Sequence, residues 1–206
     1  MARLEAQHDV AATYFFRTKR HVLRPRIVAA VNGLGHHIGY HYEDLVDARG
    51  DPQRAWDGFR RNLSRLRQIA PVDCIAMHGR PLSRWDGRDL WQHYDYRSEG
   101  IVCETYLDPD WRHLHYFTDT GRGWNNGVNL RDRPRGSDAL PSPSLPSTRA
   151  LGEFLANTRA SAMILAHPER WTATRLGWVQ AFVTDIAVNG AKLAVSRLRL
   201  SANRIA

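Results

Sequence analysis

Two stretches of the chain place side chains that can bind a metal or transfer a proton at the end of an apolar run. In the first, four imidazoles and carboxylates fall within eight residues: His36, His37, His41 and Glu43. The second ends in His167. Parallel α/β folds carry out their chemistry where strands end. Two strands that both end in histidine therefore indicate a metal-dependent hydrolase.

The elements that must position these side chains alternate along the chain. Apolar periodicity predicts strands at 12–16, 38–42, 72–77, 100–107, 113–118 and 161–166, and helices at 25–34, 52–70, 148–157 and 172–199. Such alternation predicts a parallel sheet. No phosphate-binding glycine motif follows any strand, and polar residues end different strands, which favours a (β/α) barrel. Those strand-end residues are His41, His78, Glu104, Asp119 and His167.

Three of the predicted helices are amphipathic, and in the one over 172–199 the shared face is made of Trp178, Phe182, Ile186 and Leu193. The helix over 52–70 has an apolar stripe made of Trp56, Phe59, Leu63, Leu66 and Ala70. In the helix over 25–34, the residues expected to share the buried face are Ile27, Val31 and Leu34. Each stripe has the spacing of one helical face packed on a core.

Length and composition predict a single domain over residues 1–206. A Pro/Ser-rich stretch at 131–147 is interpreted as a surface excursion. No apolar run reaches the roughly 18 residues of a membrane span, and the N-terminus lacks an apolar signal core, so we expect a cytoplasmic chain. Cys74 and Cys103 lie in strand-like runs and are expected to be reduced core residues.

The net charge of +8 comes almost entirely from arginine. A strongly basic chain raises the hypothesis of a nucleic-acid partner. The arginines are spread along the sequence rather than gathered in one block, which favours a basic solvated surface. An anionic glycan or a lipid-linked partner is the next alternative.

Several motifs resemble those of the polysaccharide deacetylase superfamily, also known as the NodB-homology or carbohydrate esterase family 4-like fold. Residues 35–41, Gly-His-His-Ile-Gly-Tyr-His, resemble its GHEIGxH signature, and residues 165–167, Leu-Ala-His, resemble its late LxH motif. Runs at 78–81, 116–119 and 167–171 resemble a subgroup associated with surface and lipopolysaccharide biosynthesis loci. The resemblance covers about residues 3–195.

The resemblance implies a distorted (β/α)7 barrel and a metal-dependent hydrolase that removes acetyl or similar acyl groups from a carbohydrate. The implied cofactor is a divalent metal, zinc first, with cobalt, nickel or manganese as alternatives. The implied metal shell is His41 with His78 or Glu43; His167 is the implied acid, and Asp119 or Glu104 would substitute for the family's base. Substrate contacts are expected from Arg80, Trp124 and Trp171.

Two departures from the family pattern limit what the resemblance implies. Leu45 stands where the family has its second metal-binding histidine. The Asp-rich first strand has no counterpart before Ala12, so we expect a barrel that lacks this strand. A barrel without its first strand would have two open sheet edges, and open edges invite pairing with other strands. The favoured explanation is that Met1 is not the true start of the protein. The alternatives are that another segment or a second copy of the chain fills the gap, or that the chain is a poorly stable remnant. The alternative function is a catalytically inactive carbohydrate-binding or structural relative.

Overall fold

The computed structural model describes residues 1–80, 83–120, 123–125, 134, 139–172, 174, 176–177, 179–180 and 182–184. The chain divides into two compact units, Met1–Pro109 and Asp110–Ala206. Both are mixed α/β and contain parallel strands, which confirms the predicted fold class at this level. A single domain over residues 1–206 stays a prediction.

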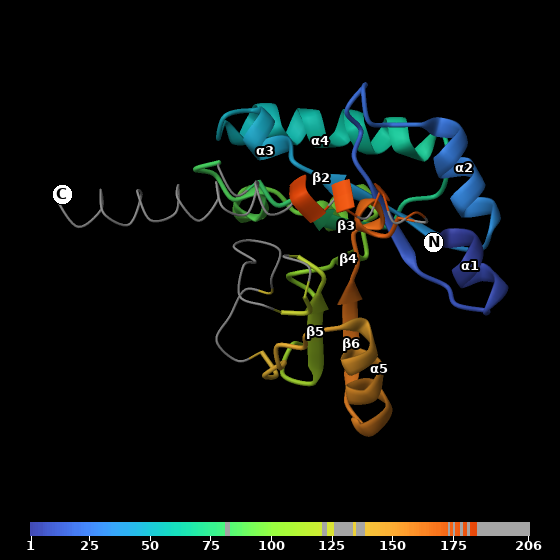
Figure 1. The fold of residues 1–206 in the computed structure, drawn as a ribbon. Helices are drawn as coiled ribbons and strands as arrows, with labels where there is room; N and C mark the ends of the chain where they lie inside the picture. Colours follow the sequence, from blue (N-terminus) through green and yellow to red (C-terminus); the bar gives the residue numbers. More distant parts are fainter. Residues whose placement is uncertain are drawn as a thin grey trace. The chain divides into compact units, whose positions relative to one another are not determined.

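The first unit contains a four-stranded parallel sheet in the order β1-β2-β3-β4 (Figure 1). The strands are β1 (Thr13–Phe16), β2 (His37–Tyr42), β3 (Cys74–Met77) and β4 (Cys103–Glu104). All four were predicted, but β4 is only two residues long instead of spanning 100–107. The pairing keeps His41 opposite Ala76 and Tyr42 opposite Met77. Consecutive strands therefore end at the same edge of the sheet.

One helix precedes these strands, and further helices connect them. They are α1 (Ala2–Gln7), α2 (Pro25–Gly33), α3 (Asp44–Asp47) and α4 (Pro52–Arg67), with 3-10 turns η1 (Gly87–Gln92) and η2 (Tyr96–Glu99). Asp51 caps α4 by accepting a hydrogen bond from the backbone N–H of Arg54 at 3.1 Å, and Pro52 suits the first turn because it has no N–H to satisfy. Sequence periodicity did not predict α1, α3, η1 or η2, which are each at most six residues long.

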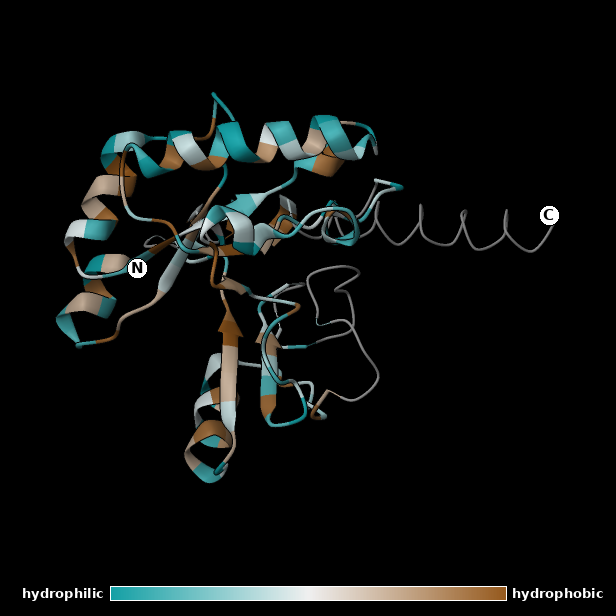
Figure 2. Cartoon of the chain, turned by 180° about the vertical axis from the view of Figure 1, so that it is seen from behind, coloured by the Kyte–Doolittle hydropathy of each residue, from teal (hydrophilic) through white to brown (hydrophobic). Residues whose placement is uncertain are grey.

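The core of the first unit lies between α4 and the sheet. Ala55, Phe59, Leu63 and Leu66 are buried along α4. The last three belong to the predicted stripe, whereas Trp56 of that stripe is only half-buried. Figure 2 shows hydrophobic and hydrophilic residues alternating along this helix. The ring of Phe59 packs against Tyr40 and Tyr42 of β2, with centroids 5.6 and 6.3 Å apart. The prediction of the α4 face is therefore confirmed, with the helix ending at Arg67 instead of Ala70.

The predicted buried face of α2 was correct at Val31 and wrong at Ile27 and Leu34. Val28 and Val31 are buried, whereas Ile27 is 54% exposed and Leu34 is 38% exposed. The helix contacts β2 and is only nine residues long. In so short a helix two apolar sets, 27/31/34 and 28/31, fit the sequence about equally well. The contact with the sheet selects the second set.

The opposite face of the sheet carries Gly39 and His41. In a strand, alternate residues share a face, so these two point away from Tyr40 and Tyr42. Phe15 of β1 lies on this face beside Gly39, and its ring centroid is 6.4 Å from that of His41. A Cβ atom at Gly39 would lie 2.3 Å from the Phe15 ring and 3.2 Å from the carbonyl oxygen of Cys74. The glycine before His41 is therefore required by close packing.

We expect Gly39→Ala to lower the free energy of unfolding by about 1–3 kcal/mol, because the added methyl group forces the Phe15 ring out of its packed position. Chemical denaturation followed by circular dichroism measures this. Gly33→Ala is the matched control: nothing lies within 4 Å of its Cβ position, and alanine in a helix is about 0.5–1 kcal/mol more favourable than glycine. Equal stability of the two variants would contradict the packing argument.

The second unit contains a two-stranded parallel sheet of β5 (Leu114–Thr118) and β6 (Ser161–Leu165), joined through α5 (Thr148–Asn157). Both strands and the helix were predicted, and Ser147 caps α5 by accepting a hydrogen bond from the N–H of Ala150 at 3.1 Å. A short 3-10 turn, η3 (Pro168–Arg170), follows β6. The core of this unit comprises Phe117, Trp124 and Leu151, with Leu145, Phe154, Leu155 and Ala162 packed around them.

Two predictions fall partly outside the described residues. Of the helix predicted at 172–199, residues 172 and 174 are described and are not helical, whereas residues 176–177, 179–180 and 182–184 are helical. Of the connector predicted at 131–147, residues 134 and 139–147 are described, and Leu145 forms an isolated antiparallel bridge with Trp124. Within the described ranges, no helix combines the length and the apolar character needed to cross a membrane.

Candidate functional site

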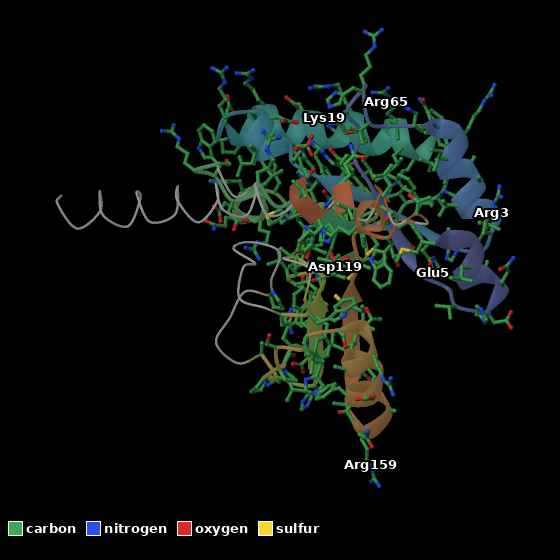
Figure 3. All side chains as sticks on the ribbon, in the orientation of Figure 1. Arg3, Glu5, Lys19, Arg65, Asp119 and Arg159 are labelled. Carbon is green, nitrogen blue, oxygen red and sulfur yellow. The ribbon has the colours of Figure 1, made fainter. Side chains whose placement is uncertain are left out.

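The strongest candidate site lies in the second unit, where β5 and β6 end. Asp119 directly follows β5, and His167 follows β6 after one residue. The N–H of Asp119 donates to the carbonyl oxygen of Leu165 at 3.2 Å, which extends the pairing of the two strands. Figure 3 labels Asp119 beyond the arrowheads of both strands. Two predicted site residues, 48 positions apart in sequence, are thus brought into contact.

Asp119 holds His167 through both carboxylate oxygens. Its Oδ1 lies 2.6 Å from His167 Nδ1, and its Oδ2 accepts the backbone N–H of His167 at 2.9 Å. Because an ionised carboxylate can only accept, Nδ1 must be the donor. The neutral imidazole then carries its lone pair on Nε2. The His167 side chain is 25% exposed, so this is an oriented acid–base group at a surface.

The environment of Asp119 keeps it ionised. Burial alone would raise the Asp119 pKa, but hydrogen bonds from the His167 ring and backbone, the His167 charge and the Trp171 indole outweigh burial and hold this pKa below its ordinary value. The indole N–H of Trp171 donates to Oδ2 at 3.1 Å. Arg170 Nη1 donates to the Asp119 carbonyl oxygen at 2.5 Å. Asp119 is therefore an anion that accepts a hydrogen bond from the His167 ring.

The two tryptophans predicted as substrate contacts have different surroundings. Trp171 is 45% exposed, and its indole is fixed by Asp119, so it can offer a flat apolar surface beside His167. Trp124 is 4% exposed and belongs to the core with Phe117. The ring centroids of the two tryptophans are 6.5 Å apart. Trp124 is therefore a core residue, and it packs near Trp171 without being exposed itself.

A second cluster lies in the first unit at the ends of β1, β2 and β3. Arg17, Glu43 and His78 each directly follow one of these strands. Glu43 Oε1 accepts from Arg17 Nε at 3.0 Å and from Nη2 at 2.8 Å. Its Oε2 accepts from Arg80 Nη1 at 2.7 Å and lies 3.3 Å from His78 Nδ1. Lys19 Nζ is 3.7 Å from Oε1.

Three predicted residues, Glu43, His78 and Arg80, therefore meet in this second cluster. Burial alone would raise the Glu43 pKa, but the adjacent His78 imidazole and the guanidinium groups of Arg17 and Arg80 outweigh it and hold the pKa well below its ordinary range. Glu43 is consequently an anion at any moderate pH. Its charge is already shared among several cations.

The predicted metal ligands do not fit a divalent ion in this arrangement. Both oxygens of Glu43 are occupied by guanidinium N–H groups, and further cations near it would repel a metal ion. Across the described ranges, no three or more His, Cys, Asp and Glu side chains are grouped to hold a metal. Zinc bound by His41, His78 and Glu43 thus stays a prediction that would require Arg17 and Arg80 to move.

His41 occupies a defined orientation on β2. Its Nδ1 lies 3.0 Å from the carbonyl oxygen of Ala76, and a carbonyl can only accept, so Nδ1 donates. Its ring meets that of His78 edge to face, with centroids 5.0 Å apart. Metal-binding histidines are commonly held in this way, with one ring nitrogen donating to a carbonyl and the other, here Nε2, facing the metal. A single histidine of this kind does not make a complete metal site.

Glu104, predicted as a substitute base, is wholly buried with no exposed surface. Its carboxylate accepts hydrogen bonds from the Tyr42 hydroxyl at 2.9 Å and from the backbone N–H groups of Met77 and Tyr106 at 3.2 and 2.7 Å. Burial raises the Glu104 pKa, although these donors oppose the shift. The residue joins the ends of β2, β3 and β4, and we leave it out of the proposed catalytic set.

The pKa of Asp44, the residue next to Glu43, is shifted upward, opposite to the shift of Glu43. Burial raises the pKa of Asp44 to about 6, although hydrogen bonds from Tyr40 and Asn62 oppose the shift. Those bonds, from the Tyr40 hydroxyl and the Asn62 amide, are each 2.7 Å long. The folded protein therefore binds this proton more tightly than the unfolded chain does. The stability gained from it is fully present below the ordinary pKa and is lost as pH rises through about 6.

We expect wild-type protein to lose up to roughly 3 kcal/mol of stability relative to Asp44→Asn between about pH 4 and pH 7, as a shift of about two pKa units implies. Urea unfolding of both proteins at several pH values measures the difference. Asp57→Asn in α4 is the control and should keep the wild-type pH dependence. If Asp44→Asn also follows the wild-type curve, the raised pKa is refuted.

Sequence reasoning missed Arg17 and Lys19 as site residues. The available signal was position: Arg17 directly follows the predicted strand at 12–16, as Glu43 and His78 follow theirs. His36, which lies near His41 in sequence, serves packing instead. It is 3% exposed, and its Nδ1 accepts the N–H of Ala12 at 3.2 Å.

Comparison of the chain with protein families, curated protein sequences and solved structures finds no match. The geometry of the two clusters is therefore the basis for the functional argument.

Proposed function

We propose that this chain is a hydrolase that removes acetyl or similar acyl groups from a carbohydrate, and that His167, oriented by Asp119, is its acid–base residue. The observation that carries the proposal is the 2.6 Å contact between Asp119 Oδ1 and His167 Nδ1 at adjacent strand ends. Such a carboxylate–imidazole pair fixes the tautomer and stabilises the imidazolium that forms during acyl transfer. The exposed Trp171 beside it supplies a stacking surface for a sugar ring.

A single imidazole can complete the hydrolysis. Nε2 of His167 takes a proton from water as the water oxygen bonds to the acyl carbon, giving a tetrahedral intermediate and an imidazolium. The imidazolium returns the proton to the leaving nitrogen or oxygen as the bond from the acyl carbon to the sugar breaks. Acetic acid, which then loses its remaining proton to water, and the deacylated carbohydrate leave, and His167 is neutral again. Asp119 keeps its negative charge throughout.

The proposal includes the finer fold that the sequence suggests, a distorted (β/α)7 barrel of the deacetylase type. Its support is the consecutive parallel order of β1 to β4, which is the order that barrel closure requires. The convergence of Arg17, Glu43 and His78 at one sheet edge also suits that architecture, because barrels place their sites at the carboxyl ends of their strands.

Release of acetate from N-acetylated chito-oligosaccharides and from O-acetylated xylan tests the proposal. We expect the wild type to release acetate from at least one substrate. The rate of release by His167→Gln should be lower by a factor of about 10² or more. Each assay is run with zinc, with cobalt and with a chelator, which also tests the predicted metal requirement. No release by folded wild-type protein under any of these conditions would refute the enzymatic proposal.

The second candidate function is carbohydrate binding without turnover. It is favoured by one observation, the occupation of both Glu43 oxygens by arginine, which leaves the family's metal shell incomplete. Glycan binding measured by calorimetry distinguishes the two functions. An inactive relative would bind glycans with equal affinity in wild type and in His167→Gln, and neither protein would release acetate.

A further inference from the structure

The cluster at the ends of β1, β2 and β3 contains more positive than negative charge. Among the described residues, three cationic side chains, Arg17, Lys19 and Arg80, share Glu43. Lys19 also forms an ion pair with Asp47. Three cations thus face two carboxylates, which leaves one positive charge uncompensated. Figure 3 labels Lys19 in this region of the first unit.

The two arginines retain capacity to bind another anion. Arg17 directs Nε and Nη2 at one oxygen of Glu43, and Arg80 directs Nη1 at the other. A guanidinium has five N–H donors, so each keeps donors beyond those used on Glu43. The Arg17 and Arg80 side chains are 26% and 42% exposed. Both are therefore reachable from solvent while Glu43 itself is buried.

His78 adds a buried ring nitrogen, Nδ1, that lacks a hydrogen-bond partner. Its Nδ1 is buried and makes no hydrogen bond, although it lies 3.3 Å from Glu43 Oε2 at an ion-pair distance. Buried polar atoms are almost always hydrogen-bonded, so an exception calls for an explanation. A small shift of the ring on ligand binding would supply the partner from Glu43 or from the ligand.

We infer that this cluster is a binding site for an oxyanion, namely the phosphate or carboxylate group of a small ligand such as a sugar phosphate or a uronic acid. Paired guanidiniums match the geometry of both groups, and the carboxyl ends of parallel strands are where α/β folds bind ligands. Glu43 holds the arginines in place and keeps them apart. No residue of the second unit enters this inference, so it stands or falls separately from the proposed hydrolysis.

Binding of three glucose derivatives at low ionic strength tests the inference. Glucose 1-phosphate and glucuronate carry the two oxyanions, and methyl glucoside is the neutral counterpart. Calorimetry gives affinities, and backbone NMR shifts locate the site. We expect one or both anionic probes to shift the resonances of Arg17, Glu43 and His78, with affinity that falls as salt is added. Methyl glucoside should leave these resonances unchanged.

Arg80→Gln is the informative variant because its side chain is the most exposed of the cluster, so folding should be preserved. We expect anion affinity to fall on the order of ten- to a hundred-fold, as for loss of a charged hydrogen bond. Arg60→Gln in α4 is the control: it removes the same charge from a side chain that is 56% exposed and paired with Glu99. It should bind like the wild type.

The outcomes separate cleanly. A response to glucose 1-phosphate alone assigns a phosphate site, a response to glucuronate alone assigns a carboxylate site, and a response to both supports the shared oxyanion chemistry. Equal losses in Arg80→Gln and Arg60→Gln would show only a general effect of net charge and overturn the inference. It is also overturned if neither anion shifts these resonances, or if zinc binds instead at micromolar concentration and Glu43→Gln abolishes that binding.

Discussion

Asp119→Asn is expected to lower the rate of acyl hydrolysis by about 10²- to 10⁴-fold, with a much smaller change in the apparent Michaelis constant. The carboxylate of Asp119 accepts from the ring and from the backbone N–H of His167 at once. An asparagine amide can accept at only one of its two terminal atoms. If its oxygen meets the backbone N–H, its NH₂ group faces His167 Nδ1 and selects the tautomer whose Nε2 is protonated. That tautomer cannot take a proton from water.

Asp119 acts through His167, so its variant needs a measurement that a merely structural role would not affect. Rescue by a conservative variant provides one: Asp119→Glu keeps a carboxylate with two accepting oxygens and should recover part of the activity that Asp119→Asn loses. Circular dichroism checks that the variant is folded. Asp110→Asn, which makes the same chemical change at a side chain 48% exposed, is the control. Activity of Asp119→Asn within twofold of that control would contradict the assigned role.

The Asp119–His167 pair was accessible to sequence reasoning for a physical reason. Each residue follows an apolar run long enough to be a buried strand, and the carboxyl ends of paired parallel strands lie at one edge. What the sequence left open was which strands are neighbours. The structure pairs β5 with β6 in register from Leu114 and Ser161 onward, and that pairing alone brings the two side chains together.

The partners of Glu43 could not be predicted in the same way. Glu43 was expected as a metal ligand only through the family resemblance, as one replacement for the histidine that is missing at Leu45. Arg17 and Arg80 are 26 and 37 positions away in sequence, and no local pattern marks an arginine that will turn toward a carboxylate. A strand-end carboxylate is thus visible in the sequence, but the sign of the charge around it is decided by tertiary contacts.

The predictions of helices and strands were more accurate where the apolar pattern was longer. The helix α4 spans more than four turns, and its stripe had only one consistent phase, so its buried face was predicted correctly. The helix α2 spans fewer than three turns, and the sheet chose between two apolar sets. Strand β4 is two residues long because the chain turns at Glu104, whose carboxylate bonds to the N–H of Tyr106. That turn is a side-chain effect that apolar periodicity cannot report.

Glu104→Leu is expected to destabilise the first unit by about 3–5 kcal/mol. The substitution preserves approximate size but leaves three buried donors without an acceptor: the Tyr42 hydroxyl and the N–H groups of Met77 and Tyr106. Each lost partner costs about 1–3 kcal/mol, and the losses are not additive because the three donors share one carboxylate. Trp91 also donates to the Tyr42 hydroxyl at 2.8 Å, so the disturbance should extend to η1.

Urea unfolding followed by tryptophan fluorescence and circular dichroism measures this loss. Glu99→Leu is the matched control, because it removes the same side chain from the surface pair with Arg60, where an exposed ion pair contributes at most about 1 kcal/mol. Glu104→Gln should fall between the two, since its amide oxygen can still accept while its NH₂ group faces a donor. A catalytic Glu104 would give the reverse pattern: Glu104→Gln would keep wild-type stability and lose acyl hydrolysis. The complete burial of the carboxylate favours the first pattern, because a group with no exposed surface cannot reach a substrate unless the ends of β2, β3 and β4 separate.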